Sequence, residues 1–252
     1  MKLIRKTIHF VYCGYAFLVF VLLMFLVFPF VMLSLLLGNI KGGNLIYQLC
    51  RLWATIWYAL IGIKHQEIYE APHDRSRQYI FVANHISYMD IPPVVLIAHQ
   101  PVRILGKYEM VKLPVFGWIY RAAVILVDRR NSETRAKSVR ALKSALKKHI
   151  SIFIFPEGTF NETTKPLKDF YDGAFRIAIE TETPIKPIIL ADTIDRLHYK
   201  GIFELTPGIN RVIYLEEVPV KGLTMNDIQS LKECVYTQME SALKRYRNYP
   251  ST

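Results

Sequence analysis

The sequence predicts an α/β fold, in which a mixed, largely parallel sheet carries helices on both faces and is preceded by two apolar N-terminal helices. Two observations predict the sheet. Short apolar runs rich in β-branched and aromatic residues recur after about residue 78, and segments with helical periodicity alternate with them. A third observation, a long uncharged stretch near the N-terminus, predicts the helical appendage. At 252 residues, the chain suits one ordinary domain plus such an appendage.

The first apolar segment runs from Phe10 to Gly38 and comprises 29 residues without a formal charge. As a helix it would be about 44 Å long, more than the ~30 Å of a bilayer's hydrocarbon core, which indicates a membrane segment. Pro29 predicts a bend or a break within it. The basic residues that precede the segment predict a cytoplasmic N-terminus; they are Lys2, Arg5 and Lys6.

A second apolar segment covers residues 45–63 and carries Arg51. A central arginine costs roughly 2.5–3.5 kcal/mol on insertion scales, which disfavours a second clean span, whereas Trp53 and Trp57 suit the membrane interface. We therefore expect residues 1–66 to form a two-helix membrane anchor that either spans once or dips into one leaflet and returns. Two helices buried in a soluble core fit less well, because the first segment is apolar all round.

Residues 67–252 have the composition of an α/β domain. Four runs are predicted as strands: 79–84, 122–127, 150–155 and 185–190. Helical periodicity predicts helices over 132–149 and 226–247. The last helix is expected to direct five side chains toward the core: Ile228, Leu231, Val235, Met239 and Leu243.

The chain is basic, because 32 Lys and Arg against 21 Asp and Glu give a formal charge of +11. This charge favours a polyanionic partner, and the apolar N-terminus favours a membrane surface over nucleic acid. Cys13, Cys50 and Cys234 are odd in number and form no CxxC pair, which argues against a disulfide framework and a zinc site. The sequence has no P-loop, GxGxxG, GxSxG or HExxH motif, so no metal and no other cofactor are expected.

Three polar clusters follow predicted strands, at the sheet edge where open α/β folds bind ligands. In the first, NHISYMD, His85 lies five positions ahead of Asp90. The carboxylate can reach one ring nitrogen and leave the other to act as a general base; the alternative is that Asp90 only caps the next helix. Ser87 is a rival nucleophile, but no nucleophile elbow surrounds it.

The second cluster is DRR at 128–130. Arg129, at the end of a predicted strand, is suited to bidentate phosphate recognition. The basic side chains of the following helix are better explained by attraction to anionic lipid.

The third cluster is FPEGT at 155–159. Gly158 allows a close approach of the backbone to a ligand. Glu157 and Thr159 can hydrogen-bond a polyol. A plain turn is the alternative for these residues taken alone.

Together these blocks resemble the glycerolipid acyltransferase family, whose best-known members are the 1-acyl-glycerol-3-phosphate acyltransferases. The first block, Asn-His, four residues, Asp, is matched in full, and so is the third, Phe-Pro-Glu-Gly-Thr. The second keeps Asp-Arg but has Ala123 where a glycine usually opens it. The fourth, a proline-containing apolar strand, is similar to TPIKPIIL with Pro187, and Lys107 resembles a lysine commonly found between the first two blocks. Order and spacing agree over about residues 78–190.

The resemblance implies that residues 67–252 form an acyltransferase domain. It would move a fatty acyl group from an acyl thioester, acyl-coenzyme A or acyl-carrier protein, to the free hydroxyl of a lysophospholipid, in the first place 1-acyl-glycerol-3-phosphate. His85 would be the base and Asp90 its orienting partner, with no metal required. The residues implied in binding the acceptor are Arg129, Lys107, Glu157, Gly158 and Thr159. We expect the protein at the inner, cytoplasmic membrane with its active site facing the cytoplasm.

Two departures from the family pattern concern the acceptor. Phe160 stands where many members have arginine, and Tyr171 and Asp172 stand where basic residues are frequent. Both departures remove positive charge beside the expected phosphate pocket, so another lyso-lipid, such as a lyso-aminolipid, is an alternative acceptor. A hydrolase that uses Ser87 and a non-catalytic lipid-surface binding protein are the further alternatives.

Overall fold

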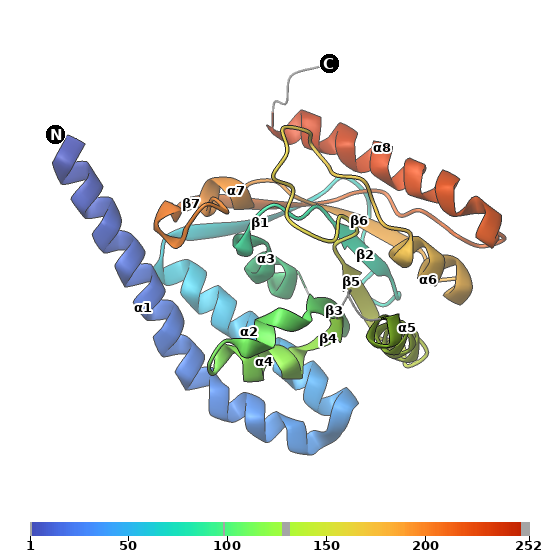
Figure 1. Ribbon diagram of the computed structural model, residues 1–252, viewed down its shortest axis with the longest axis horizontal. Helices are drawn as coiled ribbons and strands as arrows, with labels where there is room; N and C mark the ends of the chain where they lie inside the picture. The colour runs from blue at the N-terminus through green and yellow to red at the C-terminus, as the bar shows by residue number, and fades with distance from the viewer. Residues whose placement is uncertain (1, 98, 128–131, 248–252) are drawn as a thin grey trace.

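A seven-stranded mixed sheet forms the centre of the computed structural model, which describes residues 2–97, 99–127 and 132–247 (Figure 1). The strands lie in the order β1-β7-β6-β2-β5-β3-β4, and the neighbours are parallel except for β6 and β7. The predicted fold class is confirmed. The strands are β1 Ile63–Tyr69, β2 Ile80–Ala83, β3 Val102–Lys107, β4 Val124–Val127, β5 Ser151–Ile154, β6 Ile185–Leu190 and β7 Gly208–Tyr214.

The helices include a long N-terminal pair and six shorter or later ones. They are α1 Lys2–Ser34, α2 Gly38–Leu60, α3 Ile91–Leu96, α4 Phe116–Ala123, α5 Ser132–Leu146, α6 Gly173–Thr181, α7 Thr193–Arg196 and α8 Ile228–Arg247. Short 3₁₀ turns join some of them: η1 Leu35–Leu37, η2 Tyr88–Asp90, η3 Tyr108–Lys112, η4 Ile202–Glu204 and η5 Met225–Asp227.

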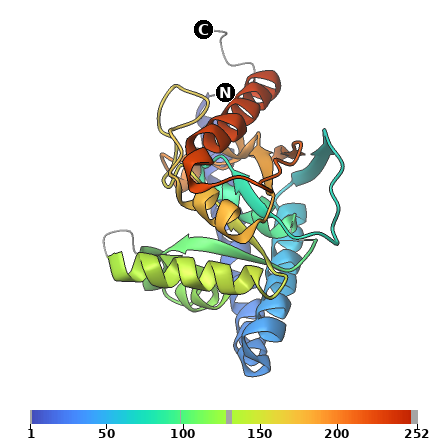
Figure 2. The same cartoon turned by 90° about the vertical axis from the view of Figure 1, so that its right-hand side faces the viewer.

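Helices cover both faces of the sheet because its central strands are apolar on both sides. In β2, Ile80 and Val82 belong to one hydrophobic cluster, and Phe81 and Ala83 belong to another, since successive side chains of a strand point to opposite faces. The first cluster includes side chains of α5, α6 and α8, and the second includes side chains of α1, α2 and α3. Figure 2 shows α5 and α2 on opposite sides of the molecule.

The N-terminal helices form an antiparallel pair. α1 continues through Pro29, so the break that the sequence allowed does not occur, and the chain turns at η1 instead. Met24 and Val31 lie on either side of the proline and are both buried, which holds the two halves of the helix in place. Gly42 of α2 lies against the carbonyl oxygen of Ser34 and leaves no room for a Cβ atom, so glycine is required at this crossing.

α1 is tied to the rest of the protein at several points along its length. His9 Nε2 donates to the carbonyl oxygen of Phe203 in η4 at 2.8 Å. Farther along, Trp57 Nε1 of α2 donates to the carbonyl oxygen of Ala16 at 3.0 Å. The helix therefore lies across the domain rather than projecting away from it.

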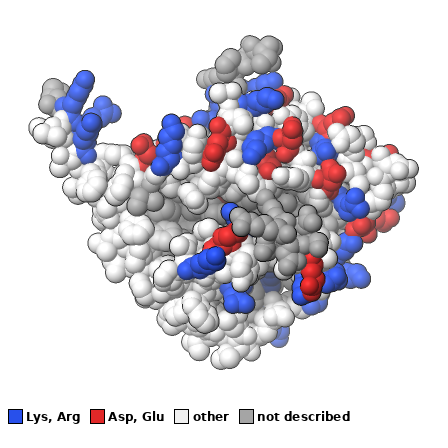
Figure 3. All heavy atoms as spheres, viewed as in Figure 1, with Lys and Arg blue, Asp and Glu red and all other residues white. Residues whose placement is uncertain are grey.

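The outer surface of the N-terminal pair is apolar. The segment Lys2–Leu60 contains a stretch long and apolar enough to cross a membrane, with mean hydropathy 3.0 and only 17% of its residues buried. Figure 3 shows this surface as an almost uncharged region below a basic N-terminal tip. Exposed side chains on it include Phe10, Phe17, Leu18, Leu22, Phe25, Leu26, Phe30, Leu33, Leu36, Leu52 and Leu60.

Most of the remaining predicted elements are found close to their predicted bounds. The strand predicted at 122–127 begins at Val124, because residues 122 and 123 end α4. In α8, Leu231, Val235, Met239 and Leu243 are buried and Ile228 is partly buried, as the helical pattern predicted. Strands β1, β3 and β7 were not predicted.

Candidate active site

His85 and Asp90 meet beyond the carboxyl end of β2. Asp90 Oδ2 lies 2.8 Å from His85 Nδ1, and it also accepts hydrogen bonds from the backbone N–H groups of Ile86 and Ser87 at 2.8 and 2.9 Å. Asp90 is fully buried, so these contacts replace water around Oδ2. A carboxylate on one ring nitrogen sets Nδ1 as the donor and leaves Nε2 as the acceptor. No residue of the described ranges hydrogen-bonds to Nε2.

The serine between the pair has a structural place. Ser87 is 0% exposed; its Oγ accepts from the N–H of Met89 at 3.0 Å and donates to the carbonyl oxygen of Leu197. Ser87 and Asp90 also form a capping box at η2. Asp90 therefore caps the turn and contacts the imidazole at the same time, and the serine hydroxyl is engaged elsewhere.

Neighbouring side chains hold His85 in position. Asn84 exchanges two hydrogen bonds with the backbone of Leu190 at the end of β6, at 2.8 and 3.0 Å. The imidazole stacks on Phe155 with ring centroids 4.0 Å apart, and the ring of Phe160 packs against it at 4.5 Å and an angle of 69°. The ring can therefore turn little about its preferred orientation.

Glu157 is buried and hydrogen-bonded to the backbone on both sides. Its side chain is 1% exposed, with Oε1 accepting from the N–H of His85 and Oε2 from the N–H of Lys168, both at 2.8 Å. Burial raises the pKa of this carboxyl to about 7. Both oxygens are bonded to the backbone, so Glu157 joins two loops around the base; its contact with the acceptor's glycerol stays a prediction.

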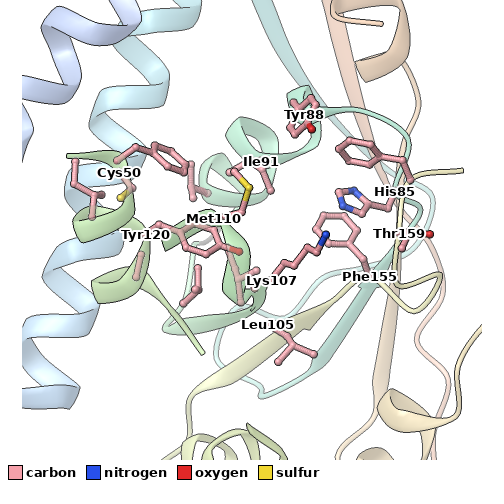
Figure 4. A pocket seen from close by; sticks show the side chains of 18 of the residues that line it. Cys50, His85, Tyr88, Ile91, Leu105, Lys107, Met110, Tyr120, Phe155 and Thr159 are labelled. Carbon is pink, nitrogen blue, oxygen red and sulfur yellow. The ribbon is translucent and has the colours of Figure 1, made fainter. Parts of the chain in front are cut away.

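A cavity of about 630 Å³ opens beside His85 (Figure 4). Its lining is mostly apolar and comes from α1, α2, α4 and β3, including Met24, Val27, Cys50, Trp53, Ile104, Leu105, Phe116, Ile119 and Tyr120. This volume lies within the usual range for small-molecule sites. The cavity is polar at the end that contains His85 and mostly apolar beyond it, which suits a ligand with a polar head and a hydrocarbon chain.

The polar end of this cavity contains several of the predicted residues. Lys107, Gly158 and Thr159 line it together with His85, and Gly158 has a positive φ of 76°, which favours glycine. Arg129 lies outside the described residues. No group of three or more potential metal ligands occurs within the described part of the chain.

Comparison with known proteins agrees with this geometry. The family model described as Acyltransferase matches residues 63–191, about half of the chain. The chain belongs to this acyltransferase family.

Several relatives of this acyltransferase have named activities. It is 29% identical over 222 residues to "1-acyl-sn-glycerol-3-phosphate acyltransferase" of Limnanthes douglasii, covering 85% of this chain and 73% of that protein. It is 28% identical over 186 residues to the protein of that name from Salmonella typhimurium, covering 73% and 74%. The match to "1-acyl-sn-glycerol-3-phosphate acyltransferase beta" of Homo sapiens, 27% identical, covers 69% of this chain and 63% of the human protein.

A solved structure shares the fold. The crystal structure of the 1-acyl-sn-glycerophosphate acyltransferase PlsC from Thermotoga maritima superposes with a TM-score of 0.73 at 24% sequence identity and covers all of both chains. The mixed sheet and its helices are thus an arrangement known in a solved protein.

Two features of the acyltransferase site were not predicted. Lys168 lines the cavity and donates from Nζ to Thr159 Oγ1 at 2.7 Å. Asn161 is 2% exposed, and its N–H donates to the carbonyl oxygen of His85 at 2.7 Å. Both follow the FPEGT block in a loop without a recognisable pattern; the adjacent polar sequence Asn161-Glu162-Thr163 was the only available signal.

Proposed function

We propose that this acyltransferase moves a fatty acyl group from an acyl thioester to the free hydroxyl of a lysophospholipid, in the first place 1-acyl-glycerol-3-phosphate. The observation that carries the proposal is the His85–Asp90 pair, whose free ring nitrogen belongs to a residue lining a mostly apolar cavity. A general base beside an apolar cavity can take the proton of an alcohol while the cavity holds an acyl chain next to it. Lipid binding alone would require no such pair.

The proton and the leaving group balance in one cycle. Nε2 of His85 takes the hydroxyl proton while the oxygen attacks the thioester carbonyl, and Asp90 stabilises the imidazolium that forms. Collapse of the tetrahedral intermediate breaks the carbon–sulfur bond, and the thiolate recovers the proton from Nε2. The donor, an acyl-coenzyme A or acyl-carrier-protein thioester, is a co-substrate, and the proposal requires no metal or other cofactor because a thiolate is a good leaving group.

The apolar cavity is the proposed place of an acyl chain. Side chains from α1, α2 and α4 line its distal part, so the N-terminal helices would both contact lipid and help form the binding space. A chain seated there would bring its carbonyl carbon toward His85.

The membrane is the proposed partner of the exposed apolar surface on α1 and α2. Because α1 is bonded to Phe203 near one end and to Trp57 farther along, it cannot cross a bilayer apart from the domain. We infer that both helices lie in one leaflet. Leu113, directly after η3, and Trp118 of α4 are 47% and 65% exposed and would contribute to the same contact. The basic N-terminal tip supports placement at the cytoplasmic face of the inner membrane.

An acceptor panel tests the proposal. The purified protein is assayed in mixed micelles with lysophosphatidate, other lysophospholipids and a lyso-aminolipid, each with acyl-coenzyme A and with acyl-carrier protein. We expect thioester consumption that depends on the acceptor and yields one diacyl product per thiol released. Release of free fatty acid at the same rate without an acceptor would contradict the transfer reaction. Faster turnover of the lyso-aminolipid would identify the alternative acceptor, which the uncharged Phe160 favours.

A further inference from the structure

The polar end of the cavity carries two ammonium groups. Lys107 ends β3, and Lys168 lies in the loop after the FPEGT block; both line the cavity together with His85. Figure 4 shows Lys107 extending across the pocket toward His85 and Thr159. Positive charges beside a low-dielectric cavity concentrate anions there.

Lys168 is held in place from two sides. Its backbone N–H donates to Oε2 of Glu157 at 2.8 Å, and its Nζ donates to Oγ1 of Thr159 at 2.7 Å. The other oxygen of Glu157 accepts from the N–H of His85. One buried carboxylate therefore fixes the backbone of the lysine relative to the base, and this preorganises the ammonium group for a ligand that reaches His85.

Among the described residues, Lys107 has only a long ion pair and Lys168 has none. The carboxylate paired with Lys107 is that of Glu109, at 3.8 Å, and Lys168 forms no ion pair with any residue that the structure describes. Phe160, next to Thr159, is uncharged and packs against the imidazole. The positive charge beside Thr159 therefore comes from Lys168, nine residues farther along the chain.

We propose that Lys168, beside the Lys107 and Thr159 that the family resemblance already assigns to the acceptor, supplies the positive charge that Phe160 lacks and so selects acceptors with an anionic headgroup. The inference rests on the proposed function in taking a lysolipid as the ligand. An ammonium group is a point charge with three donors and lacks the planar fork of a guanidinium. The subsite therefore recognises negative charge, which a phosphate monoester supplies and which the carboxylate of a lyso-aminolipid also supplies.

Binding tests the subsite without turnover. In a His85→Ala background, the affinities for lysophosphatidate and for uncharged monoacylglycerol of equal chain length are measured in mixed micelles by tryptophan fluorescence. Adding Lys168→Gln should weaken lysophosphatidate binding about tenfold or more, the usual effect of losing a hydrogen bond to a charged group, and leave monoacylglycerol binding unchanged. Lys165→Gln is the matched control, because Lys165 lies in the same loop, is exposed and does not line the cavity.

Two results of the binding experiment would overturn the inference: unchanged lysophosphatidate affinity in Lys168→Gln, or an equal loss for both ligands, which would indicate a structural role. A lyso-aminolipid arm identifies the anion, since a loss confined to it assigns the subsite to a carboxylate and a loss confined to lysophosphatidate assigns it to a phosphate.

Kinetics provides the second readout. With His85 present, Lys168→Gln should raise KM for the anionic acceptor about tenfold while kcat changes less than about threefold, and Lys168→Arg should recover most of the loss. An unchanged KM would contradict the subsite. Turnover that persists in His85→Ala would contradict the role of His85 as the base but would not change the binding affinities. Failure of the proposed function and failure of the Lys168 subsite can therefore be distinguished.

Discussion

Replacing Asp90 separates its structural role from its orienting role. Oδ2 accepts from three donors: Nδ1 of His85 and the backbone N–H groups of Ile86 and Ser87. Asp90→Ala leaves the buried N–H group of Ser87 and the partly buried one of Ile86 without their acceptor. At about 1–3 kcal/mol for each such group, the free energy of unfolding should fall by about 2–6 kcal/mol, a large share of the 5–15 kcal/mol that typically stabilises a domain.

Asp90→Asn retains an oxygen that can accept from both N–H groups, so it should destabilise the fold less than alanine does. The same oxygen still faces Nδ1 of His85, but a neutral amide no longer stabilises the imidazolium that forms when Nε2 takes the proton. We expect kcat/KM for acyl transfer to fall by about 10²–10⁴ in both variants.

The assay pairs thiol release during acyl transfer with thermal unfolding of the same preparations. The expected pattern is a folded Asp90→Asn protein with at least a hundredfold loss of transfer. An Asp90→Asn protein that keeps more than about a tenth of its transfer rate would refute the assignment of Asp90 as the orienting group.

Three further predictions concern other parts of the molecule. Burial raises the pKa of Glu157 to about 7, so the folded protein keeps a proton that the unfolded chain releases near pH 4.5, and the free energy of unfolding should fall by up to about 3 kcal/mol as the pH rises between these values. Glu157→Gln should lack this component, and a urea-unfolding free energy that changes equally between pH 5 and pH 8 in Glu157→Gln and in the unaltered protein would contradict it. Trp118→Gln should weaken binding to vesicles on the order of tenfold, because an exposed indole leaves the lipid contact; unchanged flotation with vesicles would remove α4 from that contact. Arg103 is 9% exposed and donates to Asn44 Oδ1 at 3.1 Å and to the carbonyl oxygen of Asn39 at 3.0 Å, so Arg103→Met should lower the free energy of unfolding by about 2–3 kcal/mol, and an unchanged melting temperature would show that α2 does not depend on this link.

The central strands could be predicted because they are apolar on both faces. Strands such as IFVA in β2 and SIFI in β5 are fully buried, and that pattern differs from the helical one. β1 was missed because IKHQEIY is half polar and lies at the edge of the sheet, and its residues 65–69 include the charge and hydrogen-bonding groups typical of a loop. The antiparallel placement of β7 depends on contacts between distant segments, which local patterns do not contain.

The candidate base and its partner were predictable because they are five residues apart, and a short turn is enough to bring them together. The role of Glu157 was not predictable, since it depends on which distant N–H groups its two oxygens meet. Lys168 was missed for the same reason: its place in the cavity results from the path of a long loop. The cavity itself forms only when α1, α2, α4 and β3 pack together. The sequence therefore predicted the polar residues of the site but not the apolar residues that line the cavity.

Acyl transfer by the His85→Ala variant, compared with the unaltered protein under single-turnover conditions with lysophosphatidate and an acyl thioester, tests the central claim most directly. With the fold intact and vesicle binding unchanged, we expect a transfer rate lower by about 10²–10⁴ or more. A folded variant that transfers the acyl chain at close to the original rate would show that the proton leaves the alcohol by another route.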